Sequence, residues 1–194
     1  MPRFVVQEET FLVGMDKKPA ERLRKHAEGG NAMARREMGM YCESRPGTKR
    51  DISEAIKWYT AAATQGYAEA QFDLGEFYMH GYGGVERNRK EGFRWYLKAA
   101  QQGHKFAQYE TGQCYMMGSG VEKNEAEGLK WLRKAAEQGN HKAMHDLGDY
   151  YFRHVTEPGK AAEAVKWNKM ASEHPNDSEA LTTLRLKREG MISY

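Results

Sequence analysis

Two histidines and an aspartate at helical spacing are the residues of this sequence best placed for chemistry. His141, His145 and Asp149 follow one another at intervals of four positions, so on a helix they would share one side. Imidazole and carboxylate groups on one stripe can share a metal ion such as Zn²⁺. No Glu directly follows His141, however, so the metalloprotease signature is absent. The stripe is a weak metal candidate, and polar residues of a binding face are the better interpretation.

Other catalytic patterns are missing. The glycine run from Gly81 to Gly84 lacks the Lys-Ser/Thr pair of a phosphate-binding loop and lies between two expected helices. No Ser-His-Asp or Cys-His set can be assembled with any specificity, and paired carboxylates on amphipathic helices usually form a solvated face. We therefore expect no cofactor and no enzymatic activity.

The composition also argues against several partners. The 194 residues include 30 basic and 27 acidic side chains, a net charge of +3, and they form no basic stripe for nucleic acid. No apolar run approaches the roughly 18 residues needed to span a membrane. The first 13 residues lack the continuous apolar segment of a secretory signal, so the expected location is cytoplasmic.

The elements that carry these residues repeat along the chain. The four tryptophans are separated by 37, 36 and 36 positions, and each stands in a similar helical stretch. They are Trp58, Trp95, Trp131 and Trp167. A fixed period of this length is typical of an array of helical repeats. The sequence thus predicts an all-α solenoid, in which each repeat contacts only its neighbours.

Each repeat is expected to contain two helices. A side-chain acceptor with Glu three residues later marks the start of the second helix at Asp51, Asn88 and Asn124. These helices are expected to end at Gly66, Gly103 and Gly139.

The first helices carry a central glycine in every copy. A helical glycine costs about 1 kcal/mol relative to alanine, so its repetition predicts close helix contact, with a Trp or another aromatic side chain packed over it. These glycines are Gly39, Gly75, Gly112 and Gly148.

The period divides the whole chain. The expected parts are an N-terminal arm (1–18), a capping helix (19–30), four repeats (31–66, 67–103, 104–139 and 140–176) and a C-terminal capping helix with a tail (177–194). Cys42 and Cys114 are about two repeats apart, so we expect buried free thiols and no disulfide.

The repeated motif resembles the Sel1-like repeat, a relative of the tetratricopeptide repeat. It reads Ala-x3-Leu-Gly-x2-Tyr, then Gly-x-Gly-Val, then Trp-Tyr-x-Lys-Ala-Ala-x-Gln-Gly, and the copy from Ala70 to Gly103 matches best. The resemblance implies a right-handed α–α superhelix of antiparallel helix pairs. It also implies an adaptor or scaffold role, mostly without catalysis. The cysteine pair per repeat of some secreted relatives is absent here.

By analogy with tetratricopeptide proteins, the first helices would line a concave, partner-binding face. The alternative is that several of its residues pack between repeats. The expected face consists of Met33, Arg36, Met40, Glu69, Phe72, Glu76, Met79, Phe106, Tyr109, Gln113, Met116, Lys142, His145, Asp149 and Phe152. Methionine and aromatic side chains are common at recognition surfaces.

The sequence is compatible with three functions. The leading hypothesis is a non-catalytic module that binds another protein or a peptide segment. A narrower alternative is a bacterial immunity or antitoxin-type protein that neutralises a toxin or effector. The least favoured is a metal-dependent hydrolase that uses His141, His145 and Asp149.

Overall fold

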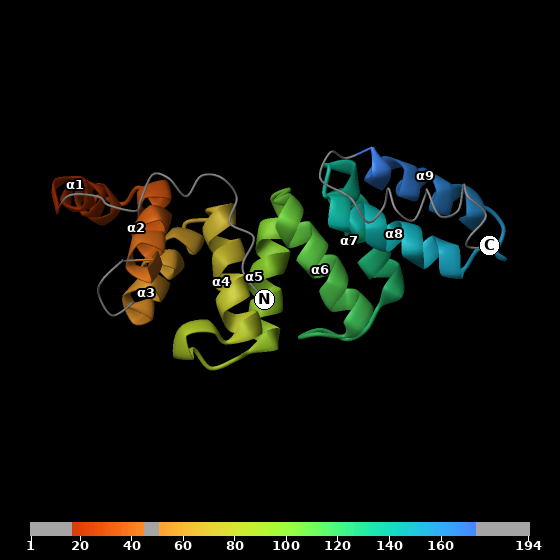
Figure 1. Cartoon of the computed structure of the whole chain (residues 1–194). Helices are drawn as coiled ribbons and strands as arrows, with labels where there is room; N and C mark the ends of the chain where they lie inside the picture. The colour runs from red at the N-terminus through yellow and green to blue at the C-terminus, as the bar shows by residue number, and fades with distance from the viewer. Residues whose placement is uncertain (1–16, 45–50, 174–194) are drawn as a thin grey trace. The chain divides into compact units, whose positions relative to one another are not determined.

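The computed structural model describes residues 17–44 and 51–173 (Figure 1). Within these residues every regular element is helical, and no strand occurs there. The helices are α1 (Lys17–Glu28), α2 (Ala32–Ser44), α3 (Ile52–Ala63), α4 (Ala68–His80), α5 (Arg89–Gln101), α6 (Lys105–Met117), α7 (Glu125–Glu137), α8 (His141–Arg153) and α9 (Lys160–Ser172), with a short 3₁₀ turn, η2 (Tyr82–Gly84). The all-α prediction is confirmed. Most of the expected arm and the C-terminal capping helix lie outside the described residues.

Helices pair in order along the chain. We call α2, α4, α6 and α8 the first helices, and α3, α5, α7 and α9 the second helices, because each first helix packs most extensively on the second helix that follows it. The chain forms two compact units, residues 1–102 with α1–α5 and residues 103–194 with α6–α9. The expected capping helix corresponds to α1, which packs against α2.

The expected helix starts are confirmed by their caps. In the first three second helices, the side chain before the helix accepts the backbone N–H three residues later. The bonds join Glu54 to Asp51 (2.9 Å), Glu91 to Asn88 (3.1 Å) and Glu127 to Asn124 (3.1 Å). The fourth second helix, α9, begins after Gly159 without a side-chain cap, as its altered sequence suggests. Each cap satisfies an N–H that the helix leaves unpaired.

The central glycines lie under the residue that follows each tryptophan, and not under the tryptophan itself. A Cβ atom at Gly39 would stand 2.8 Å from Cε1 of Tyr59, and one at Gly112 would stand 2.8 Å from Cγ of Leu132. In the other two pairs, Gly75 faces the Tyr96 ring and Gly148 faces Asn168. The predicted close approach is thus present. The predicted aromatic side chain is present only in the two pairs where Tyr59 or Tyr96 faces the glycine. The preceding tryptophan does not face it, because successive residues of a helix point in different directions.

Buried glutamines add a connection that the sequence analysis missed. In the first unit, Gln71 donates from Nε2 to the carbonyl of Ala63 (3.0 Å), and Gln102 donates to Oε1 of Gln71 (2.7 Å). The equivalent pair in the second unit is Gln138 and Gln108, at 2.7 Å. Gln71 and Gln108 are both 5% exposed. Pairing keeps these buried amides satisfied and ties the end of a second helix to its own first helix.

Each unit has a core of its own. Met38, Tyr59 and Leu74 are fully buried in the first unit, and Leu147 and Trp167 in the second. No helix in the described part of the chain is both long and apolar enough to cross a membrane.

Both cysteines are free and buried, as expected. Burial raises the pKa of the Cys42 thiol to about 11 and that of Cys114 to about 12. Neither thiol therefore forms a reactive thiolate at neutral pH.

Candidate functional site

The first helices of the first unit are joined directly by an ion pair. Arg36 on α2 donates from Nε to Oδ2 of Asp73 on α4, at 2.7 Å. Burial lowers the pKa of Arg36, but the charge and hydrogen bond of Asp73 outweigh it and raise the pKa overall. Both side chains of the pair are mostly shielded from water. Because one belongs to α2 and the other to α4, these two first helices lie side by side.

In the second unit the first helices are joined at Asp146, the equivalent of Asp73, but the donor is an amide at another position of the preceding first helix. Gln113 on α6 donates from Nε2 to Tyr109 Oη (3.1 Å) and to Oδ2 of Asp146 on α8. Burial raises the pKa of Asp146, while the Tyr109 hydrogen bond and the positive potential of His145 partly oppose the rise.

Neither Asp73 nor Asp146 was among the face residues predicted from the sequence. The available signal was an acidic residue two positions before the central glycine, which recurs in the first helix of every repeat. These residues are Glu37, Asp73, Glu110 and Asp146.

Several expected face residues are structural. Met79 is only 8% exposed, so its assignment to an open face is wrong: the first turn of α5 covers it, and Gly92 lies against its backbone. Met40, Met116 and Phe152 pack against the cores of their units. For these residues the alternative of packing within the array holds.

Tyrosines from the second helices form the floor below this surface. Tyr59 donates its hydroxyl to Oε2 of Glu43 at 3.1 Å, and Tyr96 donates to Oε1 of Glu76. The Phe72 ring lies 5.7 Å from the Tyr96 ring, so Phe72 is half-buried over this floor. The carboxylate of Glu76 is also 4.0 Å from His80 Nε2.

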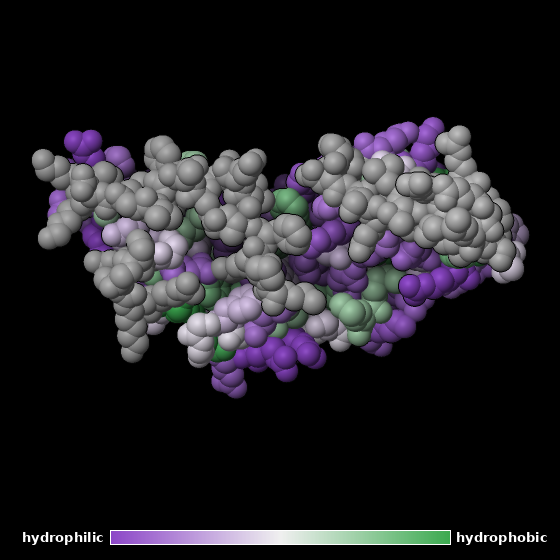
Figure 2. All heavy atoms as spheres, in the orientation of Figure 1, coloured by the Kyte–Doolittle hydropathy of each residue, from purple (hydrophilic) through white to green (hydrophobic). Residues whose placement is uncertain are grey.

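The exposed apolar residues of the face are Met33 and Phe106. They are 58% and 47% exposed and occupy the same position, one residue before the buried alanine of α2 and α6. Glu69 and Lys142 hold this position in α4 and α8. On the side of the molecule seen in Figure 2, hydrophilic side chains cover most of the coloured surface, and hydrophobic ones appear only in separate places. Because charged residues hold the equivalent position in α4 and α8, Met33 and Phe106 are separate apolar positions of their helices.

The first helices form one surface in each of the two units. The first-helix face of unit 1 consists of Met33, Arg36, Glu37, Glu69, Phe72, Asp73 and Glu76. The first-helix face of unit 2 consists of Phe106, Tyr109, Gln113, Lys142, His145, Asp146 and Asp149.

The histidine stripe does not assemble a metal site. Nδ1 of His145 lies 3.7 Å from Oδ2 of Asp149, as the helical spacing predicts. Among the described residues, however, no three His, Cys, Asp or Glu side chains converge closely enough to hold a metal ion.

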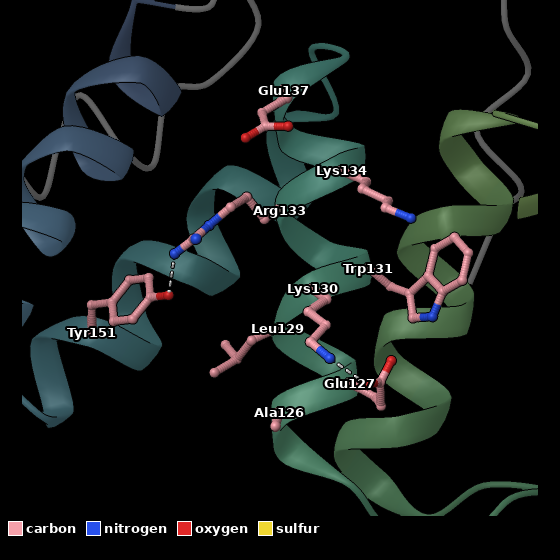
Figure 3. Close-up of a pocket in the computed structure, with 9 residues that line it drawn as sticks. All are labelled: Ala126, Glu127, Leu129, Lys130, Trp131, Arg133, Lys134, Glu137 and Tyr151. Atoms are coloured by element: carbon pink, nitrogen blue, oxygen red, sulfur yellow. Dashed lines mark hydrogen bonds and ion pairs between the residues drawn. The ribbon is translucent and has the colours of Figure 1, made fainter. Parts of the chain in front are cut away.

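Two shallow hollows lie on second helices. The larger, of about 510 Å³, surrounds the partly exposed Trp131 on α7 (Figure 3). There Lys134 Nζ stands 4.3 Å above the indole, while Lys130 pairs with Glu127 at 2.6 Å. Arg133 extends to the other side of α7 and donates to the hydroxyl of Tyr151 at 2.8 Å. These charged groups already have partners within the hollow.

The smaller hollow, of about 490 Å³, surrounds Trp58 on α3. There Ser53 donates its hydroxyl to Oδ1 of Asp51 at 2.9 Å, and the same oxygen accepts the backbone N–H of Glu54 as the cap of α3.

The helix pairs pack closely at their central glycines, and their caps recur at equivalent positions. These features define a helical-repeat protein of the tetratricopeptide type. The chain belongs to the Sel1 repeat family: the Sel1 repeat pattern matches residues 32–67, 68–104, 105–140 and 141–176. These matches lie one residue from the boundaries that the tryptophan period predicts at each repeat start. Sel1 repeat proteins generally mediate protein–protein interactions and are typically scaffolds without enzymatic activity.

Solved Sel1 repeat structures resemble the chain closely. One is c5321, described as a protective antigen of uropathogenic Escherichia coli, with 33% identity and a TM-score of 0.80 over 91% of this chain. A Sel1 repeat protein from Oxalobacter formigenes has 28% identity and a TM-score of 0.73 over 82% of this chain. This chain spans 37% and 65% of the lengths of those two proteins.

A third structure shares the fold at greater distance. Cysteine-rich protein B of Helicobacter pylori has 20% identity and a TM-score of 0.54, and the match covers 67% of this chain and 96% of that one. Comparison with curated protein sequences finds no match.

Proposed function

We propose that this chain binds a partner protein through its first-helix faces. The observation that carries the proposal is the exposure of Met33 and Phe106 at the same position of two first helices. Each belongs to a surface in which a polar bond joins neighbouring first helices. Exposed apolar side chains set among ordered polar groups are typical of contact points in protein interfaces.

The fixed polar groups favour binding in a second way. The Arg36–Asp73 pair and the Gln113–Asp146 bond hold neighbouring first helices at a set separation. A preorganised surface loses little conformational entropy when a partner binds. The residues that differ between repeats would then determine which partner is chosen.

Affinity capture from cells that naturally express the chain tests the proposal. The test variant combines Met33→Ser and Phe106→Ser, and the matched control is Val165→Ser, since Val165 is 64% exposed but lies on a second helix. We expect the test variant to lose the captured partner and the control to retain it. Both variants should keep the helical content of the wild type. Equal capture by all three proteins would reject binding through the first-helix faces.

The identity of the captured partner separates an adaptor from an immunity protein. If it is a toxin or effector, co-expression of this chain should protect cells from it, and the Met33→Ser/Phe106→Ser variant should not. A partner without toxicity would reject the immunity alternative and leave the binding proposal standing.

A further inference from the structure

The two first-helix faces carry different charges in the same register. On α4 the stripe reads Glu69, Asp73 and Glu76, at intervals of four and three residues, so the three carboxylates share one side of the helix. On α8 the residue equivalent to Glu69 is Lys142, and Asp146 is flanked by His145. The face of unit 1 is therefore the more acidic of the two.

Two of the four carboxylates of this face, Asp73 and Glu76, have side-chain partners. Arg36 pairs with Asp73 at 2.7 Å, and Glu76 accepts a hydrogen bond from Tyr96. Within the part of the chain that the structure describes, Glu37 and Glu69 form neither an ion pair nor a side-chain hydrogen bond. Both are half-buried, so their charges are only partly screened by water.

The unpaired carboxylates act on the same small region. Burial raises the pKa of the Tyr67 phenol, and the negative charges of Glu69, Glu37 and Asp73 raise it further, while Arg36 opposes them. These charged side chains of α2 and α4 therefore act on one phenol, that of the residue directly before α4.

Apolar surface adjoins this negative region. Met33 is 58% exposed on α2, and Glu37 follows it by one helical turn on the same stripe. Met40 continues the stripe by a further turn and is half-buried. A segment laid across the face would therefore meet an apolar contact beside two carboxylates.

We propose that the first-helix face of unit 1 takes a partner segment in which Lys or Arg side chains flank an apolar residue. The apolar residue packs on Met33 and the cations pair with Glu37 and Glu69. The Arg36–Asp73 pair already shows that a guanidinium fits a carboxylate of this face, and charge-assisted bonds of this type are strong and directional. This inference rests on the proposed function and specifies the chemistry of its partner.

Selection from a library of random linear peptides displayed on phage, with the full chain as bait, tests the inference. The test variant is Glu37→Gln with Glu69→Gln. The matched control is Glu86→Gln with Glu122→Gln, two exposed carboxylates in the segments between helices. We expect enriched peptides to combine basic and apolar residues and to bind the test variant about tenfold more weakly than the wild type. Binding should also weaken as salt is raised, and the control should match the wild type.

Three results would overturn the inference. Neutral or acidic peptides that bind the Glu37→Gln/Glu69→Gln variant normally but fail on Met33→Ser would reject the basic partner and leave the proposed function in place. A peptide set unaffected by all face variants, or no enriched peptide at all, would reject both. Self-association in sedimentation, lost in the Glu37→Gln/Glu69→Gln variant, would assign the face to a second copy of this chain.

Discussion

At the scale of single residues, Thr111 combines a polar side chain with a fully buried position. It stands where other repeats carry Met38, Leu74 or Leu147, is fully buried, and its hydroxyl has no hydrogen-bond partner among the described residues. A buried hydroxyl without a partner costs about 1–3 kcal/mol.

Thr111→Val should therefore stabilise the protein, because valine keeps the shape of threonine and removes the unpaired hydroxyl. We expect the free energy of unfolding to rise by about 1 kcal/mol, measured by urea denaturation followed by circular dichroism. Thr111→Ser is the control: it keeps the hydroxyl, removes a methyl group and should destabilise. Loss of stability in Thr111→Val would indicate that the hydroxyl has a partner after all.

Asp146 should make the stability of the protein depend on pH. Its folded-state pKa lies above the ordinary value of 3.8, chiefly because of burial. Tyr109, His145, Asp149 and Lys142 influence this pKa, and Gln113 donates a hydrogen bond to the carboxylate. A carboxyl whose pKa rises on folding favours the folded state below the unfolded pKa, and this contribution is lost as the pH rises through the folded pKa.

Asp146→Asn removes this titration and keeps an acceptor for Tyr109. We expect the stability difference between the variant and the wild type to grow in favour of the variant as the pH rises from about 3.8. Urea denaturation of both proteins from mildly acidic to neutral pH measures the difference. A constant difference over that range would show that Asp146 titrates alike in the folded and unfolded states.

At the scale of helices, the central glycines determine how closely each pair packs. Gly75→Ala would place a methyl group against the ring of Tyr96, which is fully buried and bonded to Glu76. Overpacking of this kind costs about 1–3 kcal/mol, against a gain of about 1 kcal/mol in helix propensity. We therefore expect Gly75→Ala to destabilise the protein by about 1–2 kcal/mol.

Gly148→Ala is the matched comparison. Its neighbour is the amide of Asn168, the end of a half-buried side chain that can turn away. We expect this variant to be near the wild type in stability or slightly above it, within about 1 kcal/mol. Thermal unfolding of both variants measures the contrast, and equal destabilisation would mean that backbone approach, and not the facing side chain, requires glycine.

The helical elements were the part of the fold most accessible from the sequence. The caps at Asp51, Asn88 and Asn124 were predicted correctly, because such signals act within a few residues of the chain. The helices end two or three residues before the expected stops at Gly66, Gly103 and Gly139, which have positive φ. The partner of each central glycine was predicted only in part, since it depends on how the second helix is rotated. The buried Gln71–Gln102 bond was missed because it joins residues 31 positions apart.

At the scale of the whole chain, the two compact units should respond separately to local damage. Repeat proteins are stabilised by contacts within repeats and between neighbours, and the cores around Leu74 and Leu147 belong to different units. A defect in one unit should therefore loosen that unit first.

Hydrogen exchange on the Gly75→Ala variant measures this separation. We expect the amides of α4 and α5 to exchange faster than in the wild type, while those of α8 and α9 stay close to it. A uniform loss of protection in all four helices would show instead that the units unfold as one.

The sequence by itself determined the family, the number of repeats and the starts of the capped second helices, because the tryptophan period and the caps are local and recur in register. It also predicted that the first helices form a binding face, but of the 15 residues expected there it could not separate exposed Met33 and Phe106 from buried Met79. That separation depends on which side chains the neighbouring helix covers. Only the tertiary structure showed which of these side chains are exposed. It also showed that Arg36 pairs with Asp73, while Glu37 and Glu69 form no ion pair within the described residues. Such contacts cannot be read from the sequence, because they arise only when successive first helices lie side by side.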